Sequence, residues 1–135
     1  MAELNVPARV DNLDEVIDFV NRQLDETDCS MKVQVQIDVA VEEIFVNIAS
    51  YAYAPGEGGA CIRFEADREK NEALITFIDG GVPYDPLAKP DPDVTLSAEK
   101  RQIGGLGIYM VKKSMDGMTY RYEDGKNILT IMKKL

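Results

Sequence analysis

Two oxygen-bearing side chains, Glu43 and Asn47, stand four residues apart in the stretch VEEIFVNIAS. Positions four apart lie on the same face of a helix, and Ser50 extends this polar stripe by three residues. A carboxylate and an amide so placed could hold a water molecule and a hard cation, since Mg²⁺ prefers oxygen ligands and keeps several waters. Taken alone, the stripe is read more readily as a solvated helix face.

A second candidate, Asp79, ends the apolar run ALITFI and is followed at once by Gly80 and Gly81. A carboxylate at a strand end can accept a hydrogen bond from the amino group of a ligand, and glycine lets that ligand approach the backbone. The same letters also describe an ordinary Asp-Gly turn after a strand. By itself this segment leaves both readings open.

The third candidate is a group of glycines, Gly104, Gly105 and Gly107, at the start of the run IGGLGIYMVKK. Glycine costs about 1 kcal/mol relative to alanine inside a helix, so three beside a helix start need a reason. Backbone N–H groups at a helix N-terminus, where the helix dipole is positive, suit a phosphate. The alternative is a hinge that needs unusual backbone angles, and this stretch does not decide between the two.

Together, these motifs are the parts of a nucleotide pocket: a cation-binding helix, an acceptor for an amino group and a glycine-rich phosphate site. The formal net charge of -9 argues against a nucleic-acid surface. It also means that an anionic ligand needs help from backbone N–H groups, a helix N-terminus or a cation. The chain contains no histidine, which removes the commonest general base and metal ligand.

The elements that must position these motifs follow from the spacing of apolar residues. Residues 2–7 are expected to form a short strand, and a helix is expected from Asp11, with Asp11 or Asn12 as its N-cap. A longer helix from about Met31 to Tyr53 would carry Glu43 and Asn47, although its first part also alternates like a strand.

Turn chemistry predicts two β-hairpins, one from residues 60–67 and 72–79 and one from residues 118–123 and 127–134. Between them lies a long segment rich in proline and glycine, and then a short helix over 106–116. This order predicts an α+β fold, a two-layer α/β sandwich with helices on one face of a mixed sheet. A doubly wound Rossmann sheet would need strand–helix units in alternation, which the order does not supply.

We expect one domain over residues 1–135, because the chain is long enough to bury a core of its own. It has no apolar run long enough to span a bilayer and no signal-peptide pattern, so a cytoplasmic protein is expected. Cys29 and Cys61 have no metal-like spacing and are expected as free, mostly buried thiols.

The order of the three motifs resembles that of the anti-sigma-factor serine/threonine kinases, stand-alone members of the histidine-kinase-like (GHKL) ATPases with the Bergerat-type ATP-binding fold. The segment VEEIFVNIASYAY is similar to the asparagine box of that family, DGGVPYDP to its adenine-binding segment and IGGLGIYMVKKSMD to its second glycine box. The tail YRYEDGKNILTIMKKL is similar as well. Tyr51 stands where that branch often has a histidine.

The resemblance implies roles for individual residues. Asn47 matches the asparagine that ligates a Mg²⁺ ion bridging the ATP phosphates, and Glu43 matches the proposed general base toward a protein hydroxyl. Asp79 matches the aspartate that reads the adenine amino group, and Gly81 matches the glycine packed beneath the base.

The resemblance extends to the glycine-rich segment and to the loop before it. The phosphate-contacting glycines are matched by Gly105 and Gly107, with Gly104 beside them. The loop from about residue 88 to 103 matches the ATP lid, where Lys100 and Arg101 could reach the γ-phosphate or form a solvated charge pair.

The function that the resemblance implies is a bacterial ATP-dependent serine/threonine protein kinase. Such a kinase phosphorylates a small antagonist protein and regulates a sigma factor or similar partner by partner switching, often as a homodimer. The first alternative is a non-catalytic module in which ATP gates the binding of another protein. The second, a self-contained ATPase of the gyrase or Hsp90 type, is disfavoured because those proteins couple hydrolysis to further domains. Neither nucleic acid nor membrane is an expected partner.

Overall fold

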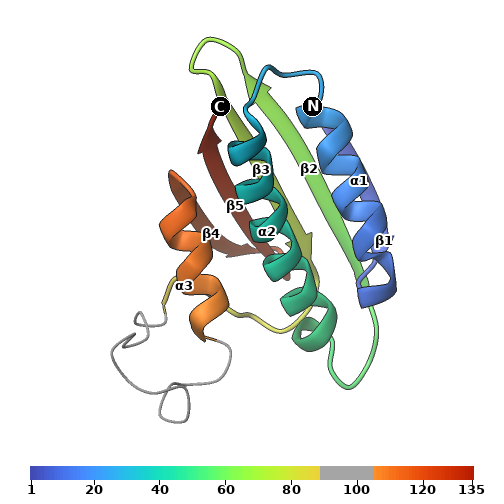
Figure 1. Ribbon diagram of the computed structural model, residues 1–135. Coiled ribbons are helices and arrows are strands. Elements are labelled where there is room, and N and C mark those ends of the chain that lie inside the picture. The colour runs from blue at the N-terminus through green and yellow to red at the C-terminus, as the bar shows by residue number, and fades with distance from the viewer. Residues whose placement is uncertain (89–104) are drawn as a thin grey trace.

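The computed structural model describes residues 1–88 and 105–135, and its framework is one β-sheet with helices on one side (Figure 1). Within the described residues the sheet has the strand order β1-β2-β3-β5-β4. The strands in that order are β1 (Ala2–Pro7), β2 (Gly59–Asp67), β3 (Glu72–Asp79), β5 (Lys126–Lys134) and β4 (Gly117–Glu123). The last strand along the chain, β5, therefore lies inside the sheet rather than at its edge.

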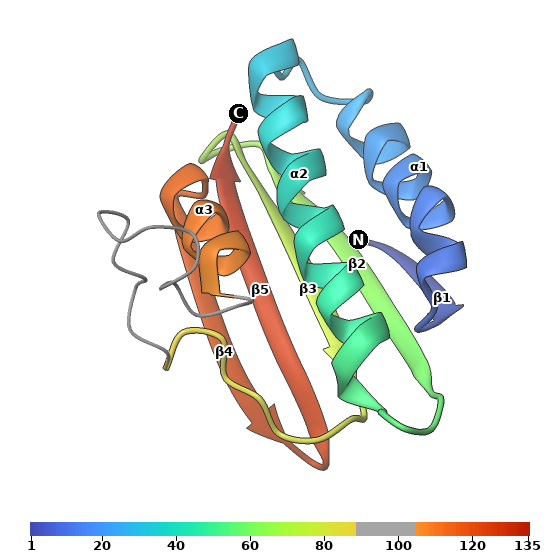
Figure 2. The same ribbon diagram turned by 60° about the horizontal axis from the view of Figure 1, so that its bottom comes forward.

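Helices α1 (Leu13–Leu24), α2 (Met31–Asn47) and α3 (Gly105–Ser114) cover the same face of the sheet. In both views α2 runs along the middle of the sheet, between α1 and α3 (Figures 1 and 2). A short 3-10 turn, η1 (Val10–Asn12), leads into α1, and a π-helical turn, η2 (Ile48–Ala52), continues α2. The expected α+β fold with two layers and helices on one face is confirmed.

The prediction of a mixed sheet was wrong, because every pair of neighbouring strands is antiparallel. Two helices connect β1 to β2, so the chain reverses its direction an odd number of times and the two strands oppose each other. The connection from β3 through α3 to β4 does leave those two strands pointing the same way. They are not neighbours, however, because β5 pairs antiparallel with both.

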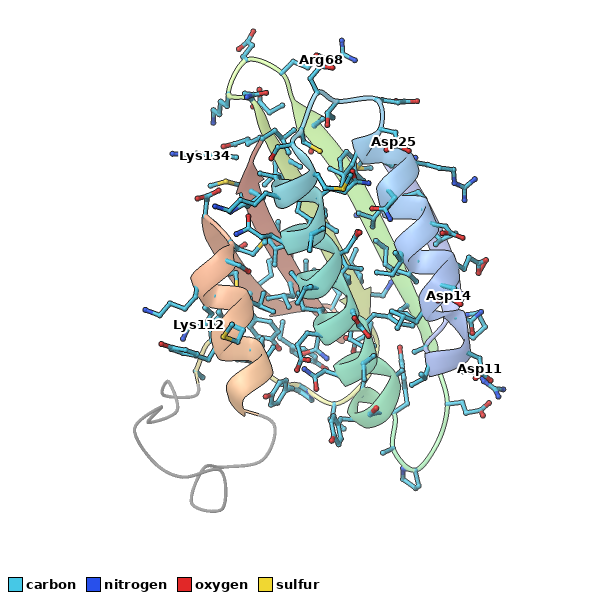
Figure 3. All side chains as sticks on the ribbon, viewed as in Figure 1. Asp11, Asp14, Asp25, Arg68, Lys112 and Lys134 are labelled. Carbon is cyan, nitrogen blue, oxygen red and sulfur yellow. The ribbon has the colours of Figure 1, made fainter. Side chains whose placement is uncertain are left out.

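The core lies between the helices and the sheet and follows the period of two along the strands. In β3 the buried positions are Ala73, Ile75, Phe77 and Asp79, so the last buried position of the strand carries a carboxylate. Charged side chains such as Asp14, Asp25 and Arg68 point outward from the molecule (Figure 3). A buried apolar layer thus ends in a buried polar group at one end of β3.

The register of β3 determines which residues meet that carboxylate. Asp79 lies opposite Ala60 of β2 on one side and opposite Asn127 of β5 on the other. The Asp124–Gly125 turn, with φ angles of 53° and 75°, joins β4 to β5 and sets the register between those two strands, in which Tyr122 lies opposite Asn127. The predicted hairpins are therefore present, and one of them delivers Asn127 to the end of β3.

Helix α2 has clear local reasons to form where it does. Ser30 is its N-cap, and the Ser30 side chain accepts a hydrogen bond from the backbone N–H of Val33 at 3.2 Å. Its buried positions, Ile37, Ala40, Val41, Ile44 and Phe45, have the spacing of one helix face. Tertiary burial of this stripe overrides the strand-like alternation at the start of the segment.

Two smaller expectations have mixed outcomes. Cys29 and Cys61 are both free thiols, as predicted, but each is half-buried rather than mostly buried. Asn12 occupies the N-cap position of α1, yet its side chain makes no capping hydrogen bond. In the described part of the chain, no helix is long and apolar enough to cross a membrane.

Candidate functional site

The buried carboxylate of Asp79 forms the floor of the candidate site. Its side chain is 6% exposed, and its Oδ1 atom accepts two hydrogen bonds of 2.9 Å each, from the backbone N–H of Gly81 and from Nδ2 of Asn127. Within residues 1–88 and 105–135, no protein group donates a hydrogen bond to the other oxygen, Oδ2. A buried carboxylate with one unused acceptor is suited to a ligand that brings a donor.

A cavity of about 390 Å³ opens above Asp79, between α2, α3 and the sheet. This volume lies in the range of small-molecule sites, which are mostly apolar with a few converging polar groups. The walls are mainly aliphatic and aromatic, and the polar side chains among them include those of Asp79, Asn127 and Asn47. Among the described residues the lining consists of Ile44, Asn47, Ile48, Tyr51, Ala52, Phe77, Asp79, Val82, Tyr84, Pro86, Ile108, Tyr120, Asn127 and Leu129.

Glu43 and Asn47 lie one turn apart on α2, as the sequence predicts, and contact each other. Nδ2 of Asn47 donates a hydrogen bond of 3.3 Å to Oε1 of Glu43. Asn47 lines the cavity, whereas Glu43 does not. This contact leaves the amide oxygen of Asn47 as the atom suited to a cation.

Gly107 brings the first turn of α3 against Glu43. A side-chain Cβ at position 107 would overlap with the carboxylate of Glu43, so only glycine permits this approach without a shift. The carboxylate consequently lies at the positive end of the α3 dipole, where the first N–H groups of a helix have no partner within the helix. The structure thus brings Glu43 and Gly107 together beside Asn47, which lines the cavity.

The helix that carries the predicted glycines begins one residue earlier than expected. Gly107 lies in the first turn of α3, as the expected helix over 106–116 implies, whereas Gly105 is the first residue of the helix rather than the residue before it. Their N–H groups still belong to the helix N-terminus, which is the part that suits a phosphate. Gly104, the predicted lid and its Lys100 and Arg101 lie outside the described residues, apart from residue 88 at the start of the lid.

A close contact with the backbone of Ala52 requires glycine at position 81. A Cβ there would overlap with the backbone carbonyl and the side chain of Ala52, and the neighbouring N–H of Val82 donates a hydrogen bond of 2.9 Å to that same carbonyl. The segment after β3 therefore crosses directly over the end of η2. Tyr53 closes the same corner, because its hydroxyl donates to the carbonyl of Gly59 and accepts from the N–H of Gly80.

Sequence reasoning missed Asn127 and Tyr120. Asn127 is 5% exposed and contacts Asp79 directly, while the Tyr120 hydroxyl donates a hydrogen bond to Oδ1 of Asn127. One signal was present, because Asn127 shares its strand face with Leu129 and Ile131, both of which are buried. A polar residue on a buried strand face needs partners, and here they come from β3 and β4.

Taken together, the two-layer fold and the cavity over a buried aspartate are suited to a small ligand that brings a hydrogen-bond donor, such as a nucleotide. Residues 6–133 match the family model of the histidine kinase-like ATPase domain, and the chain belongs to this family. The resemblance inferred from the motifs is confirmed at this level, and membership implies that the chain binds ATP.

Comparisons with individual proteins agree with the family. The chain is 28% identical over 102 residues to the serine/threonine-protein kinase BtrW of Bordetella bronchiseptica. The matched region covers 76% of this chain and 71% of that protein. It is also similar in fold to the crystal structure of the RsbU and RsbW domains of Rv1364c from Mycobacterium tuberculosis, with a TM-score of 0.64 and 14% sequence identity. That match covers 100% of this chain and 33% of the solved chain.

Proposed function

We propose that the chain is an ATP-dependent serine/threonine protein kinase of the anti-sigma-factor type. It would phosphorylate a small antagonist protein and, through partner switching, regulate a sigma factor or similar protein in the bacterial cytoplasm. We further propose that residues 1–135 act as one domain and form a homodimer. The observation that carries the proposal is the cavity that brings Asp79, Asn47 and the first turn of α3 together.

Asp79 is the proposed acceptor for the adenine amino group. Its Oδ2 atom faces no donor among the described residues, and the apolar walls of the cavity suit the faces of a purine ring. Phe77, on the same strand as Asp79, and Leu129, on the neighbouring strand β5, contribute to those walls. Gly81 would allow the base to lie close to the backbone, in addition to the contact with Ala52 that the structure already requires.

Asn47 is the residue that fits a Mg²⁺ ion. Its amide oxygen is available because its Nδ2 is the atom that contacts Glu43. Among the described residues, no group of three or more acidic or cysteine side chains is placed to hold a metal ion. Mg²⁺ does not need such a cage, because it is commonly held by one or two side chains, substrate phosphates and water. When bound, the ion would neutralise charge that develops on the phosphates.

Glu43 is the proposed proton acceptor for the transfer step. The hydroxyl oxygen of the substrate forms a bond to the γ-phosphorus while the bond from that phosphorus to its bridging oxygen breaks, and ADP leaves with the electron pair. Glu43 would take the hydroxyl proton, provided that the hydroxyl comes within hydrogen-bond distance. The N–H groups of the first turn of α3, at Gly105 and Gly107, would hold the phosphates in line.

The direct test is phosphoryl transfer from radiolabelled Mg·ATP to an antagonist-domain protein from the same genome. We expect label on a serine or threonine of that protein. Glu43→Gln should abolish transfer and largely retain ATP binding, because glutamine keeps the acceptor for Asn47 but not the basic carboxylate. Glu42→Gln is the matched control, since Glu42 is the adjacent, exposed carboxylate on the same helix. Intact ATP binding without any transfer would contradict the kinase assignment.

One observation favours a second candidate, an ATP-gated protein-binding module without catalysis. The Glu43 carboxylate is already engaged by Asn47 and lies against Gly107, outside the lining of the cavity. If that arrangement persists with ATP bound, Glu43 would help to shape the site rather than accept a proton. Partner binding that depends on ATP and survives unchanged in Glu43→Gln would support this module.

A further inference from the structure

Asn127 is the centre of a buried hydrogen-bond network that joins four segments of the chain. Its Nδ2 donates to Oδ1 of Asp79 and to the carbonyl of Val82, both at 2.9 Å. Its Oδ1 accepts from the backbone N–H of Tyr84 at 3.1 Å and from the hydroxyl of Tyr120. The side chain therefore uses both its donors and both its acceptor positions inside the protein.

This network permits only one orientation of the Asn127 amide. Exchanging the amide oxygen and nitrogen would place the oxygen against two acceptors, on Asp79 and Val82, and the nitrogen against the N–H of Tyr84. Buried groups left without partners are costly, so the inverted form is excluded. Partial burial also raises the pKa of Tyr120 above its ordinary value, so its hydroxyl keeps the proton that it donates.

The locked amide controls which atoms of Asp79 remain for a ligand. Oδ1 of Asp79 receives two donors, from Asn127 and Gly81, and so its acceptor capacity is used. Only Oδ2 can accept from a base in the cavity. The amino group of adenine needs one acceptor oxygen, whereas the adjacent N1–H and 2-amino donors of guanine suit a carboxylate that offers both oxygens.

We propose that Asn127 is the positioning residue that makes this site select a 6-aminopurine nucleotide over a guanine nucleotide. It acts through Asp79, by occupying one carboxylate oxygen and directing the other into the cavity. The inference rests on the proposed nucleotide site. Asn127 also hydrogen-bonds to Val82 and Tyr84, two residues of the cavity lining, and so connects them to the end of β3.

The test compares the binding of Mg·ATP and Mg·GTP by titration calorimetry for the full chain and its variants. Asn127→Leu keeps a similar shape but removes the donor to Asp79. We expect the ratio of the GTP to the ATP dissociation constant to fall by at least about tenfold, since hydrogen bonds to charged groups are worth roughly that much. Thr130→Val is the matched control, because Thr130 lies on the same strand but bonds to Thr76 on the sheet face away from the helices. Its ratio should remain that of the wild type.

A second variant covers the case in which Asn127→Leu does not fold. Tyr120→Phe keeps the ring and removes one of the two donors that lock the amide, so the ratio should fall a few-fold in the same direction. A role limited to stability would weaken ATP and GTP binding equally and leave the ratio unchanged. If the wild type prefers ATP and a folded variant keeps the wild-type ratio, the role of Asn127 is overturned and the proposed function remains intact. A wild-type chain that binds neither nucleotide would overturn both.

Discussion

Asp79 is a buried carboxylate, and one of its two oxygens receives no hydrogen bond from the described residues. The protein supplies two donors to Oδ1, which offsets part of the cost of removing a carboxylate from water. At Oδ2 the described residues supply none, so that atom relies on water or on a ligand. In the proposed function, the donor for Oδ2 is the amino group of the bound nucleotide.

Replacing Asp79 by asparagine tests this view, because the two side chains have nearly the same shape. The network around Oδ1 can be kept, but an NH₂ group then faces the amino group of adenine. We expect the affinity for ATP to fall by roughly 10- to 100-fold, the effect of one unsatisfied buried pair. Equilibrium binding of a fluorescent ATP analogue measures it. The control is Asp85→Asn, which alters a carboxylate outside the cavity lining, and equal loss in both variants would contradict the role of Asp79.

Cys61 gives a pH-dependent prediction on the other side of the sheet. Partial burial, together with its hydrogen bond and charge repulsion with Glu3, raises the pKa of the thiol from 9.0 to about 11. In a Cys29→Ser background, iodoacetamide should react at pH 8 roughly a hundredfold more slowly than with an unfolded chain, because the thiolate is the nucleophile. Glu3→Gln should speed the reaction. Equal rates in the folded and unfolded chains would refute the shift.

The raised pKa of Cys61 also determines how stability changes with pH. The folded state holds the Cys61 proton more tightly than the unfolded state does, so its contribution is complete below pH 9 and is lost as the pH rises toward about 11. Urea unfolding at pH 8 and pH 10.5 measures the change. Cys61→Ser should flatten the part of the profile that lies between those values.

At the scale of elements, two close contacts of glycine hold the site together, and they differ in what they touch. Gly81 lies against the backbone of η2 at Ala52, whereas Gly107 lies against the flexible end of the Glu43 side chain. Backbone cannot move aside as a side chain can. The two positions should therefore respond differently to the same added methyl group.

We expect Gly81→Ala to lower the free energy of unfolding by about 1–3 kcal/mol, as overpacking commonly does. Gly107→Ala should change stability little, because Glu43 can move away and alanine favours the helix. Its effect should appear instead as reduced phosphoryl transfer, since Glu43 is displaced. Urea unfolding and the transfer assay together separate the two outcomes. A large loss of stability in Gly107→Ala would show that Glu43 is held rigidly.

Elements also show where sequence reasoning succeeds. The polar turn at residues 68–71 and the Asp124–Gly125 turn each predict one of the two hairpins, because turn chemistry is a local property. The order of strands in the sheet is not local. Whether β4 or β5 lies beside β3 depends on how α3 packs, so the mixed sheet was predicted where an antiparallel one forms.

In the candidate site, too, local features could be predicted from the sequence and non-local features could not. Asn47, Asp79 and Gly107 could be proposed from short motifs, because each motif combines a residue type with a local element. Asn127 could not, since its bond to Asp79 joins residues 48 positions apart and is set by strand register. The reason for Gly81 is likewise tertiary, because Ala52 reaches it only through the π-helical end of α2.

For the whole molecule, a ligand that binds only the folded state must raise its stability. At 100 times the dissociation constant, Mg·ATP should add about 2.7 kcal/mol to the free energy of unfolding. Asn47→Ala should lose the part of this gain that depends on Mg²⁺, and the gain with ATP and EDTA should be unchanged. Thermal unfolding with and without Mg²⁺ measures both. A Mg²⁺-dependent gain that persists in Asn47→Ala would assign the cation to other groups.

The position of β5 also matters while the protein is being made. It follows all the other described strands along the chain, yet it fills the gap between β3 and β4 and supplies Asn127 to Asp79. A nascent chain that has emerged from the ribosome only as far as β4 lacks Asn127 and Leu129, the residues that β5 contributes to the cavity lining. We therefore expect nucleotide binding to begin only after β5 has emerged and paired with β3.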